Sequence, residues 1–141
     1  MSKQLLFEYL GKYRTMSLAT SDGAGDVNCA TVCYAFDDSG RIYFGCSGQT
    51  LKARHLGRSS RVGVTMDDGG QSMMGLQVRG TARPMSDATS ISDARGRLTE
   101  RHPSIAEFYA SPDVLFFRIE PSECFVINFS WGVDSRLAVE L

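Results

Sequence analysis

The sequence predicts a mainly β fold, an antiparallel barrel of six or seven strands with a few small helices. Three observations support this fold class. Short segments rich in Val, Ile, Thr and aromatic residues recur along the chain, and several of them alternate between apolar and polar residues. Gly-containing clusters separate these segments at turn-like intervals. Helical spacing of apolar residues is confined to a few short stretches.

Composition narrows the class of protein. A chain of 141 residues predicts one domain, residues 1–141. The 15 Lys and Arg residues nearly balance the 16 Asp and Glu residues, which disfavours general nucleic-acid binding. No apolar run approaches the roughly 20 residues that span a bilayer, and the apolar stretch near the start is too short and too charged for a signal peptide. We therefore expect a cytoplasmic protein without a membrane segment.

The first third of the chain predicts a helix followed by a β-meander. Residues 3–13 place apolar side chains at helical spacing. Residues 15–20 (TMSLAT) alternate as a strand that ends at SDGAGD. Residues 27–36 (VNCATVCYAF) predict one long strand, and DDSGR supplies a hairpin turn into a strand at residues 42–46.

A helix is predicted next, at residues 49–56 (QTLKARHL). Ser47 or Thr50 is available as its N-cap, and Gly57 marks its end. Lys52 lies in the first turn of this helix. Unpaired backbone N–H groups at a helix start favour an anion, and nearby hydroxyls and an ammonium strengthen that preference. The segment therefore has the composition of a phosphate site, although a solvated helix cap has the same composition.

The rest of the chain predicts four more strands with helical segments between the second and third of them. These strands are expected at residues 61–66, 76–85, 113–119 and 123–129. Ser86 or Asp87 caps a helical stretch that runs through Arg101, and Pro103 ends it. Residues 104–110 predict one or two further helical turns.

The cysteines and histidines form no metal or redox motif. The four cysteines lack a C-x-x-C pair, and we expect them in the core or lining a pocket of a protein kept in a reducing compartment. His55 is expected at the surface, and His102 at the end of a helix. No Ser/His/Asp set or pair of acids at a meaningful spacing supports hydrolytic chemistry.

The order of these pieces resembles the pyridoxamine 5'-phosphate oxidase-like, FMN-binding split-barrel family. The resemblance is strongest over SGQTLKARHLGRSSRVGVTM, next strongest over GLQVRGTAR, and covers most of the chain. It implies a homodimer with flavin mononucleotide (FMN) at the subunit interface. In this family a Lys at the position of Lys52, with the preceding turn, holds the FMN phosphate, and neighbouring strands face the ring. The candidate flavin-binding residues are Cys29, Ala30, Thr31, Tyr34, Gly45, Cys46, Ser47, Thr50, Leu51, Lys52, Gly75, Gln77 and Trp131.

Three departures from the family pattern bear on function. Vitamin-processing members carry Arg where this chain has Cys29 and Leu51, and Arg54, Arg58 and Arg61 are the nearby residues that could replace those charges. The C-terminal R-L-H-D-R signature of true pyridoxamine-phosphate oxidases is absent, since the chain ends FSWGVDSRLAVEL. The resemblance therefore predicts an FMN-dependent oxidoreductase or reductase with another substrate.

The sequence leaves the reaction open. A small molecule or a pyridine nucleotide could be the electron donor, and no residue stands out as an acid or a base. One alternative is a flavin-binding stress or storage protein without turnover. Another is a haem-handling split barrel, in which His55 would be the residue to test.

Overall fold

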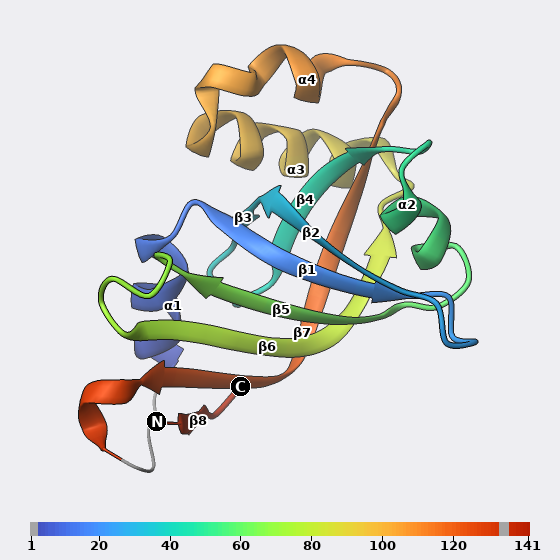
Figure 1. Cartoon of the computed structure of the whole chain (residues 1–141). Coiled ribbons are helices and arrows are strands. Elements are labelled where there is room, and N and C mark those ends of the chain that lie inside the picture. The colour runs from blue at the N-terminus through green and yellow to red at the C-terminus, as the bar shows by residue number, and fades with distance from the viewer. Residues whose placement is uncertain (1–2, 133–135) are drawn as a thin grey trace.

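The computed structural model describes residues 3–132 and 136–141, and in them it shows one antiparallel sheet with small helices around it (Figure 1). The sheet has eight strands in the order β2-β1-β5-β6-β7-β4-β3, and β8 pairs with β7. The strands are β1 Thr15–Ser21, β2 Val27–Cys33, β3 Ala35–Phe36, β4 Ile42–Ser47, β5 Arg61–Asp67, β6 Met74–Pro84, β7 Val114–Asn128 and β8 Arg136–Val139. The helices are α1 Lys3–Lys12, α2 Leu51–Leu56, α3 Ala88–Arg101 and α4 Ala106–Ala110, with 3₁₀ turns η1 Pro103–Ile105 and η2 Phe129–Trp131. The predicted fold class is confirmed, with one strand more than expected because β8 was not predicted.

The sheet curls because its two edge strands are consecutive in the chain. Strand β2 pairs with β1 and strand β3 pairs with β4, and Tyr34 alone separates them. The Tyr34 side chain is fully buried, and its hydroxyl donates to the carbonyls of Leu10 at 2.6 Å and Tyr13 at 2.9 Å. The single strand predicted over residues 27–36 is therefore wrong at Tyr34, where the chain changes partner and closes the half-barrel.

Strand β7 is longer than predicted. Residues 113–119 and 123–129 were expected to be two strands, but they belong to one strand that continues through Pro121. It pairs with β6 from Phe117 to Asn128, with a register shift immediately before Gly80. A side chain at Gly80 would place its Cβ 2.2 Å from the carbonyl oxygen of Glu120, so the strands can approach this closely only at a glycine. The irregular pairing accommodates the proline within the sheet.

Two helix caps settle alternatives that the sequence left open. The Thr50 hydroxyl accepts from the Ala53 N–H at 3.3 Å and caps α2. The Asp87 carboxylate accepts from the Ser90 N–H at 2.9 Å and caps α3. Both are the residue types that satisfy unpaired N–H groups at a helix start.

Two hydrophobic cores hold the fold together. The first fills the inside of the curled sheet, where the alternating residues of β1 and β5 are buried and α1 covers one end with Leu6 and Leu10. The second lies between helices α3 and α4 and the outer face of β4 and β7, around Leu98, Tyr109 and Phe116. The outer face of β1, β2 and β5 carries no helix (Figure 1). Along each of these strands, exposed residues on the outer face alternate with buried or partly buried residues on the inner face. The fold therefore leaves one sheet face open.

Among the described residues, no helix combines the length and the apolar composition needed to cross a membrane.

Candidate functional site

The turn between β4 and α2 brings two hydroxyl side chains beside Lys52. The Ser47 hydroxyl oxygen accepts from the Gln49 N–H at 3.2 Å, and the Thr50 hydroxyl donates to the Ser47 carbonyl at 2.8 Å. The Thr50 hydroxyl donates to the Ser47 carbonyl and accepts from the Ala53 N–H, so both of its roles are filled. The Ser47 oxygen accepts a hydrogen bond, and its O–H has no acceptor among the described residues, so it remains available to donate. Lys52 follows in the first turn of the helix, where the N–H groups of Leu51 and Lys52 precede the first intrahelical bonds.

A pocket of about 290 Å³ opens beside this turn (the Lys52 pocket). Six of the residues expected to bind a flavin line it: Thr31, Gly45, Cys46, Ser47, Thr50 and Lys52. The opposite wall was not anticipated from the sequence. It comes from η1 and α4 and consists of Ile105, Phe108 and Tyr109, with Val32 and Cys33 beside them. Apolar spacing in SIAEFYA predicted a helix there, but no local signal predicted that it would face the Lys52 turn.

The Lys52 pocket is free of carboxylates, as none of its lining residues is acidic. Within residues 3–132 and 136–141, no carboxylate lies within 4.0 Å of the Lys52 ammonium. Burial raises the pKa of the neighbouring Cys46 thiol, against the opposing influence of Thr50 and Lys52, so this thiol is protonated at neutral pH. The pocket therefore offers one uncompensated positive charge with hydroxyl and N–H donors, a set suited to an anion.

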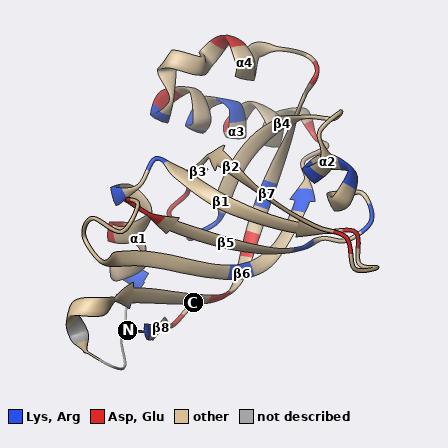
Figure 2. Cartoon of the chain, viewed as in Figure 1, with Lys and Arg blue, Asp and Glu red and all other residues tan. Residues whose placement is uncertain are grey.

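The stretch of sequence that contains α2 is also basic. Between Asp38 and Asp67 the chain contains no acidic residue, and Figure 2 shows Lys and Arg gathered at α2 and after it. Arg54 donates through Nη1 to the Gln49 carbonyl at 3.1 Å, which holds its guanidinium against the turn that precedes the helix. Of the three arginines considered as replacements for the missing charges, Arg54 is thus the one bonded to this turn among the described residues.

Gly45 has a structural reason to be a glycine. A Cβ at this position would lie 3.1 Å from Val114 Cγ1 and 3.2 Å from Phe116 Cε1, both on the neighbouring strand β7. The absence of a side chain lets the second core pack directly against this end of β4. Gly45 contributes backbone, not a side chain, to the wall of the Lys52 pocket.

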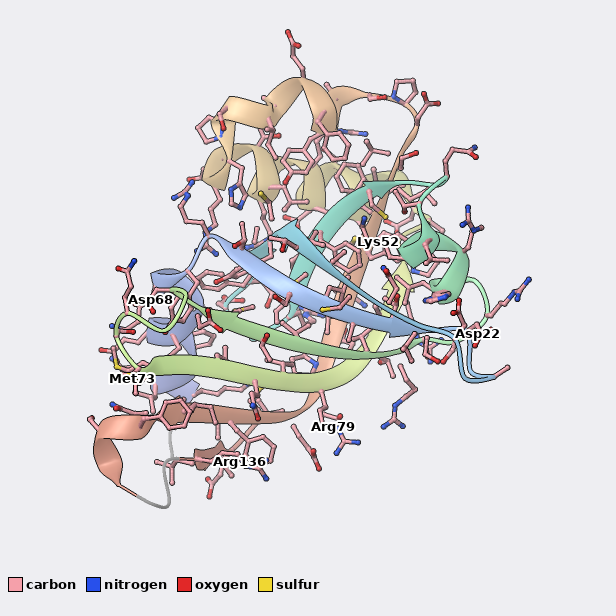
Figure 3. All side chains as sticks on the ribbon, viewed as in Figure 1. Asp22, Lys52, Asp68, Met73, Arg79 and Arg136 are labelled. Carbon is pink, nitrogen blue, oxygen red and sulfur yellow. The ribbon has the colours of Figure 1, made fainter. Side chains whose placement is uncertain are left out.

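A second group of candidate residues lies apart from the Lys52 pocket, on the open face of the sheet. Cys29 and Gln77 line a shallow pocket of about 270 Å³ with small residues such as Ala19 and Gly63. Gln77 and Gly75 line another of about 230 Å³, whose apolar wall includes Met73 at the end of the β5–β6 loop, immediately before β6 (Figure 3). The two pockets share Thr65 and Gln77 and so form one groove across β5 and β6.

Three candidates, Tyr34, Ala30 and Leu51, do not contribute a side chain to these pockets. Tyr34 lies in the core with its hydroxyl bonded to backbone carbonyls, so its predicted place along a flavin ring is wrong. Ala30 is partly buried against the first core, because it alternates with the exposed Cys29. Leu51 is 37% exposed and lines none of the pockets described above. The Trp131 side chain lies outside the described residues.

Both histidines are buried, which corrects the expectation that His55 lies at the surface. His55 is 3% exposed; its Nδ1 lies 2.9 Å from Thr20 Oγ1 and its Nε2 lies 2.9 Å from an Asp26 carboxylate oxygen. His102 ends α3 as expected but is 5% exposed, with Nε2 2.7 Å from the Tyr34 carbonyl. Burial lowers the pKa of His102, so it is neutral at physiological pH.

The cysteines are divided between core and surface. Cys46 and Cys124 are buried, Cys33 is half-buried, and Cys29 is exposed on the open face of the sheet. In the described part of the chain, no group of three or more His, Cys, Asp or Glu side chains is placed to hold a metal ion.

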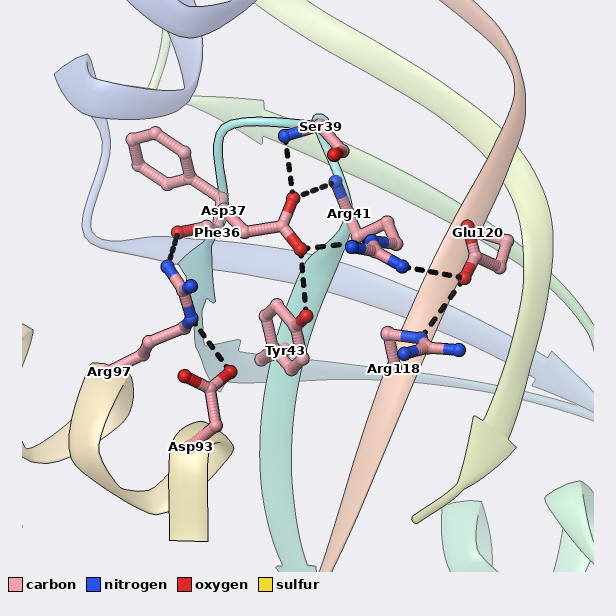
Figure 4. Close-up of polar contacts among 9 residues, drawn as sticks. All are labelled: Phe36, Asp37, Ser39, Arg41, Tyr43, Asp93, Arg97, Arg118 and Glu120. Carbon is pink, nitrogen blue, oxygen red and sulfur yellow. Dashed lines mark hydrogen bonds and ion pairs between the residues drawn. The ribbon is translucent and has the colours of Figure 1, made fainter. Parts of the chain in front are cut away.

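A second polar cluster, at the other end of β4, has its charges satisfied internally (Figure 4). The Asp37 carboxylate accepts from the backbone N–H of Ser39 and Arg41 at 2.9 and 3.1 Å, from Arg41 Nε at 2.9 Å and from the Tyr43 hydroxyl at 2.7 Å. Glu120 lies 4.0 Å from Arg41 and 3.0 Å from Arg118. This cluster (the Asp37 cluster) ties a β-turn to the sheet and leaves Asp37 no free acceptor for a ligand.

Comparisons with known proteins identify the family and the fold. A family model described as pyridoxamine 5'-phosphate oxidase matches residues 3–128. No curated protein matches the sequence. Three solved structures show the breadth of the fold, each with identity under 25%.

The first, Atu2129 from Agrobacterium tumefaciens (unknown function), has a TM-score of 0.73 and 24% identity, over 81% of this chain and 50% of its own. HutZ, the heme storage protein from Vibrio cholerae, has a TM-score of 0.76 and 20% identity, over 88% and 93%. General Stress Protein 26 from Bacillus anthracis has a TM-score of 0.71 and 17% identity, over 89% and 92%. This chain therefore spans half the length of the Agrobacterium protein and nearly all of the other two.

Proposed function

Because the chain belongs to the pyridoxamine 5'-phosphate oxidase family, we propose that it binds FMN between two copies of itself and serves as an FMN-dependent oxidoreductase. One observation supports this above the others. Lys52 lines a pocket of about 290 Å³ that has no acidic lining residue, and no carboxylate of the described residues pairs with it. A buried or half-buried cation without a partner is costly unless a ligand supplies the counter-charge.

The donors of the Lys52 pocket fit the phosphate end of FMN. Lys52 supplies the charge, the Ser47 O–H is free to donate, and the first backbone N–H groups of α2 are unpaired. Arg54 lies against the same turn and supplies a second positive charge near the position where Leu51 replaces an arginine. When bound, FMN supplies the chemistry, since its ring accepts a hydride or electrons.

The open sheet face fits the ring end and the second copy of the chain. It presents small residues such as Ala19, Cys29 and Gly63, which allow close approach of a partner sheet. Gln77 on the same face carries both a donor and an acceptor, as the pyrimidine edge of a flavin requires. In this proposal the Lys52 pocket binds the phosphate of FMN and the open sheet face binds the ring. A second copy of the chain would cover the ring and complete the site.

The reaction we propose is a reduction or oxidation in which the protein provides binding and orientation. The titratable groups that line the Lys52 pocket are the cation itself, two thiols and the Tyr109 phenol, and none of them is a carboxylate or a histidine. The electron donor would be a small molecule or a pyridine nucleotide in the cytoplasm. The missing R-L-H-D-R signature argues against pyridoxamine-phosphate oxidation.

Haem binding is the second candidate, because the fold is shared with HutZ, the heme storage protein from Vibrio cholerae. The two histidines do not favour it. Both ring nitrogens of His55 lie within hydrogen-bond distance of Thr20 and Asp26, and His102 bonds the Tyr34 carbonyl. Neither imidazole is free to ligate iron without breaking a buried hydrogen bond, so FMN is the better-supported ligand.

The test is the visible spectrum of the protein after addition of FMN and desalting. We expect retained bands near about 370 and 450 nm, and Lys52→Glu should weaken FMN binding by about 100-fold or more, since it replaces attraction by repulsion. Lys12→Glu makes the same charge change on α1, away from the pocket, and should leave binding unchanged. A wild-type protein that FMN cannot reconstitute would refute the proposal, and a Soret band from added haem would favour the second candidate.

A further inference from the structure

Helix α2 carries its own buried anchor one turn after Lys52. His55 is 3% exposed and joins three segments, since Nδ1 lies 2.9 Å from Thr20 Oγ1 on β1 and Nε2 lies 2.9 Å from Asp26 in the β1–β2 turn. We propose that the Asp26–His55–Thr20 chain is a positioning device that holds Lys52 in place for the phosphate of FMN. This inference rests on the proposed function.

The helix needs such an anchor because it is short. Helix α2 has six residues, and a helix of this length has little stability of its own. Its apolar contacts are limited to the buried Leu56 and the partly buried Ala53. Residues three apart on a helix are neighbours on its surface, so fixing the direction of His55 also fixes the direction in which Lys52 leaves the helix.

The backbone of the turn that carries Asp26 is held by its own hydrogen bonds, and the Asp26 side chain itself is 62% exposed. Asp22 accepts the N–H groups of Ala24 and Asp26 at 2.8 and 3.0 Å, and its own N–H donates to the Asp26 carbonyl at 3.1 Å. Gly23 and Gly25 take positive φ angles of 81° and 109°, which the tight turn requires. The turn therefore presents Asp26 to His55 from a fixed backbone position.

The hydrogen-bond chemistry sets the direction of the chain. An ionised carboxylate only accepts, so His55 Nε2 carries the proton that it donates to Asp26. In the neutral ring, Nδ1 then accepts from the Thr20 hydroxyl, and both ring nitrogens are satisfied. His55→Gln removes the ring whose two nitrogens contact Thr20 and Asp26, and so weakens this link while keeping a polar side chain.

The experiment compares the affinities of FMN and riboflavin, which lacks the phosphate. We expect His55→Gln to weaken FMN binding by about tenfold and riboflavin binding by less than about twofold, because only the phosphate contacts depend on Lys52. Asp26→Asn should show the same selectivity with a smaller loss. In a Lys52→Ala background, His55→Gln should cause no further loss of FMN affinity.

His102→Gln is the matched control, since His102 is also buried and hydrogen-bonded but lies away from α2. It should lower the thermal midpoint without changing the preference for FMN over riboflavin. If His55→Gln weakens both flavins equally, or still weakens FMN binding when Lys52 is absent, its role is only structural and this inference is overturned. A wild-type protein that binds neither flavin overturns the proposed function and this inference with it.

Discussion

The two ends of strand β4 place a charged group in opposite situations. Near its start, the Asp37 carboxylate is 3% exposed and accepts four hydrogen bonds, one of them from Tyr43 on β4 itself. Near its end, Lys52 faces a pocket with no acidic lining residue, and it has no carboxylate partner in the described ranges. One charge is satisfied by the fold, and the other is the charge that the proposed ligand would satisfy.

The difference shows which charges serve folding and which serve binding. Burial opposes the ionisation of Asp37, but the Tyr43 hydroxyl, the N–H groups of Ser39 and Arg41, and the Arg41 charge more than offset it, so the pKa of Asp37 lies below its ordinary value. The folded state therefore stabilises the Asp37 anion. No carboxylate of the described residues compensates the positive charge of Lys52 in this way. Changes in the Asp37 cluster should alter the free energy of unfolding, whereas changes at Lys52 should alter affinity.

The largest effect on stability is expected from Asp37→Asn. The amide places an NH₂ group or a neutral oxygen where Arg41 Nε and the Tyr43 hydroxyl now donate to a carboxylate oxygen. Breaking a buried pair of this kind leaves donors unsatisfied, and we expect the free energy of unfolding to fall by about 2–3 kcal/mol. Urea denaturation of the two proteins at pH 7 measures the difference.

The matched variant at the other end of β4 is Lys52→Gln. It removes one charge of an unpaired side chain, and its effect on the free energy of unfolding should stay within about 0.5 kcal/mol. Equal losses from Asp37→Asn and Lys52→Gln would mean that Lys52 has a structural partner and that the contrast between the two ends of β4 is mistaken.

The sequence predicted local structure better than it predicted which strands pair with each other. Helix α2, its Thr50 cap and the Lys52 turn follow from short-range chemistry, and the structure has them as expected. Tyr34 was misplaced because an alternating pattern cannot show that a strand changes partner in its middle. The four-residue strand β8 was missed because it is short and depends on pairing with β7.

Contacts between distant segments account for the errors in the site. Phe108 and Tyr109 complete the Lys52 pocket from a helix that lies more than fifty residues further along the chain. His55 was expected in solvent because its partners, Thr20 and Asp26, are 35 and 29 residues away. Six of the predicted residues do line one pocket. They come from strand β2 and from the segment that joins β4 to α2, which the fold brings together.

Acid should remove the stabilising effect of Asp37 in a defined range of pH. Its pKa is lowered in the folded state, so its contribution is fully present above the unfolded value of about 3.9 and is lost as pH falls through the lower folded value. The stability difference between wild type and Asp37→Asn should therefore be constant above about pH 5 and narrow below about pH 4. Urea denaturation at intervals from pH 7 to pH 3 tests this. A gap that closes between pH 6 and pH 8 instead would point to a group other than Asp37.

A smaller loss than that of Asp37→Asn is expected from Tyr43→Phe, which removes one of the four donors to Asp37 and leaves the ring in the second core. Burial and the bond to Asp37 raise the pKa of Tyr43 to about 12, so the hydroxyl remains a donor at every pH at which the carboxylate is ionised. Its loss should cost about 1 kcal/mol of the free energy of unfolding.

Tyr13→Phe gives the opposite case, because the buried Tyr13 hydroxyl has no hydrogen-bond partner in the part of the chain that the structure describes. Removing an unsatisfied hydroxyl should leave stability unchanged or raise it by up to about 1 kcal/mol. If both Tyr→Phe changes lower the free energy of unfolding equally, then the burial of the hydroxyl determines the loss, and its bond to Asp37 does not. If only Tyr43→Phe is costly, and the cost disappears in the Asp37→Asn background, the phenol contributes to stability through the carboxylate, as the satisfied end of β4 requires.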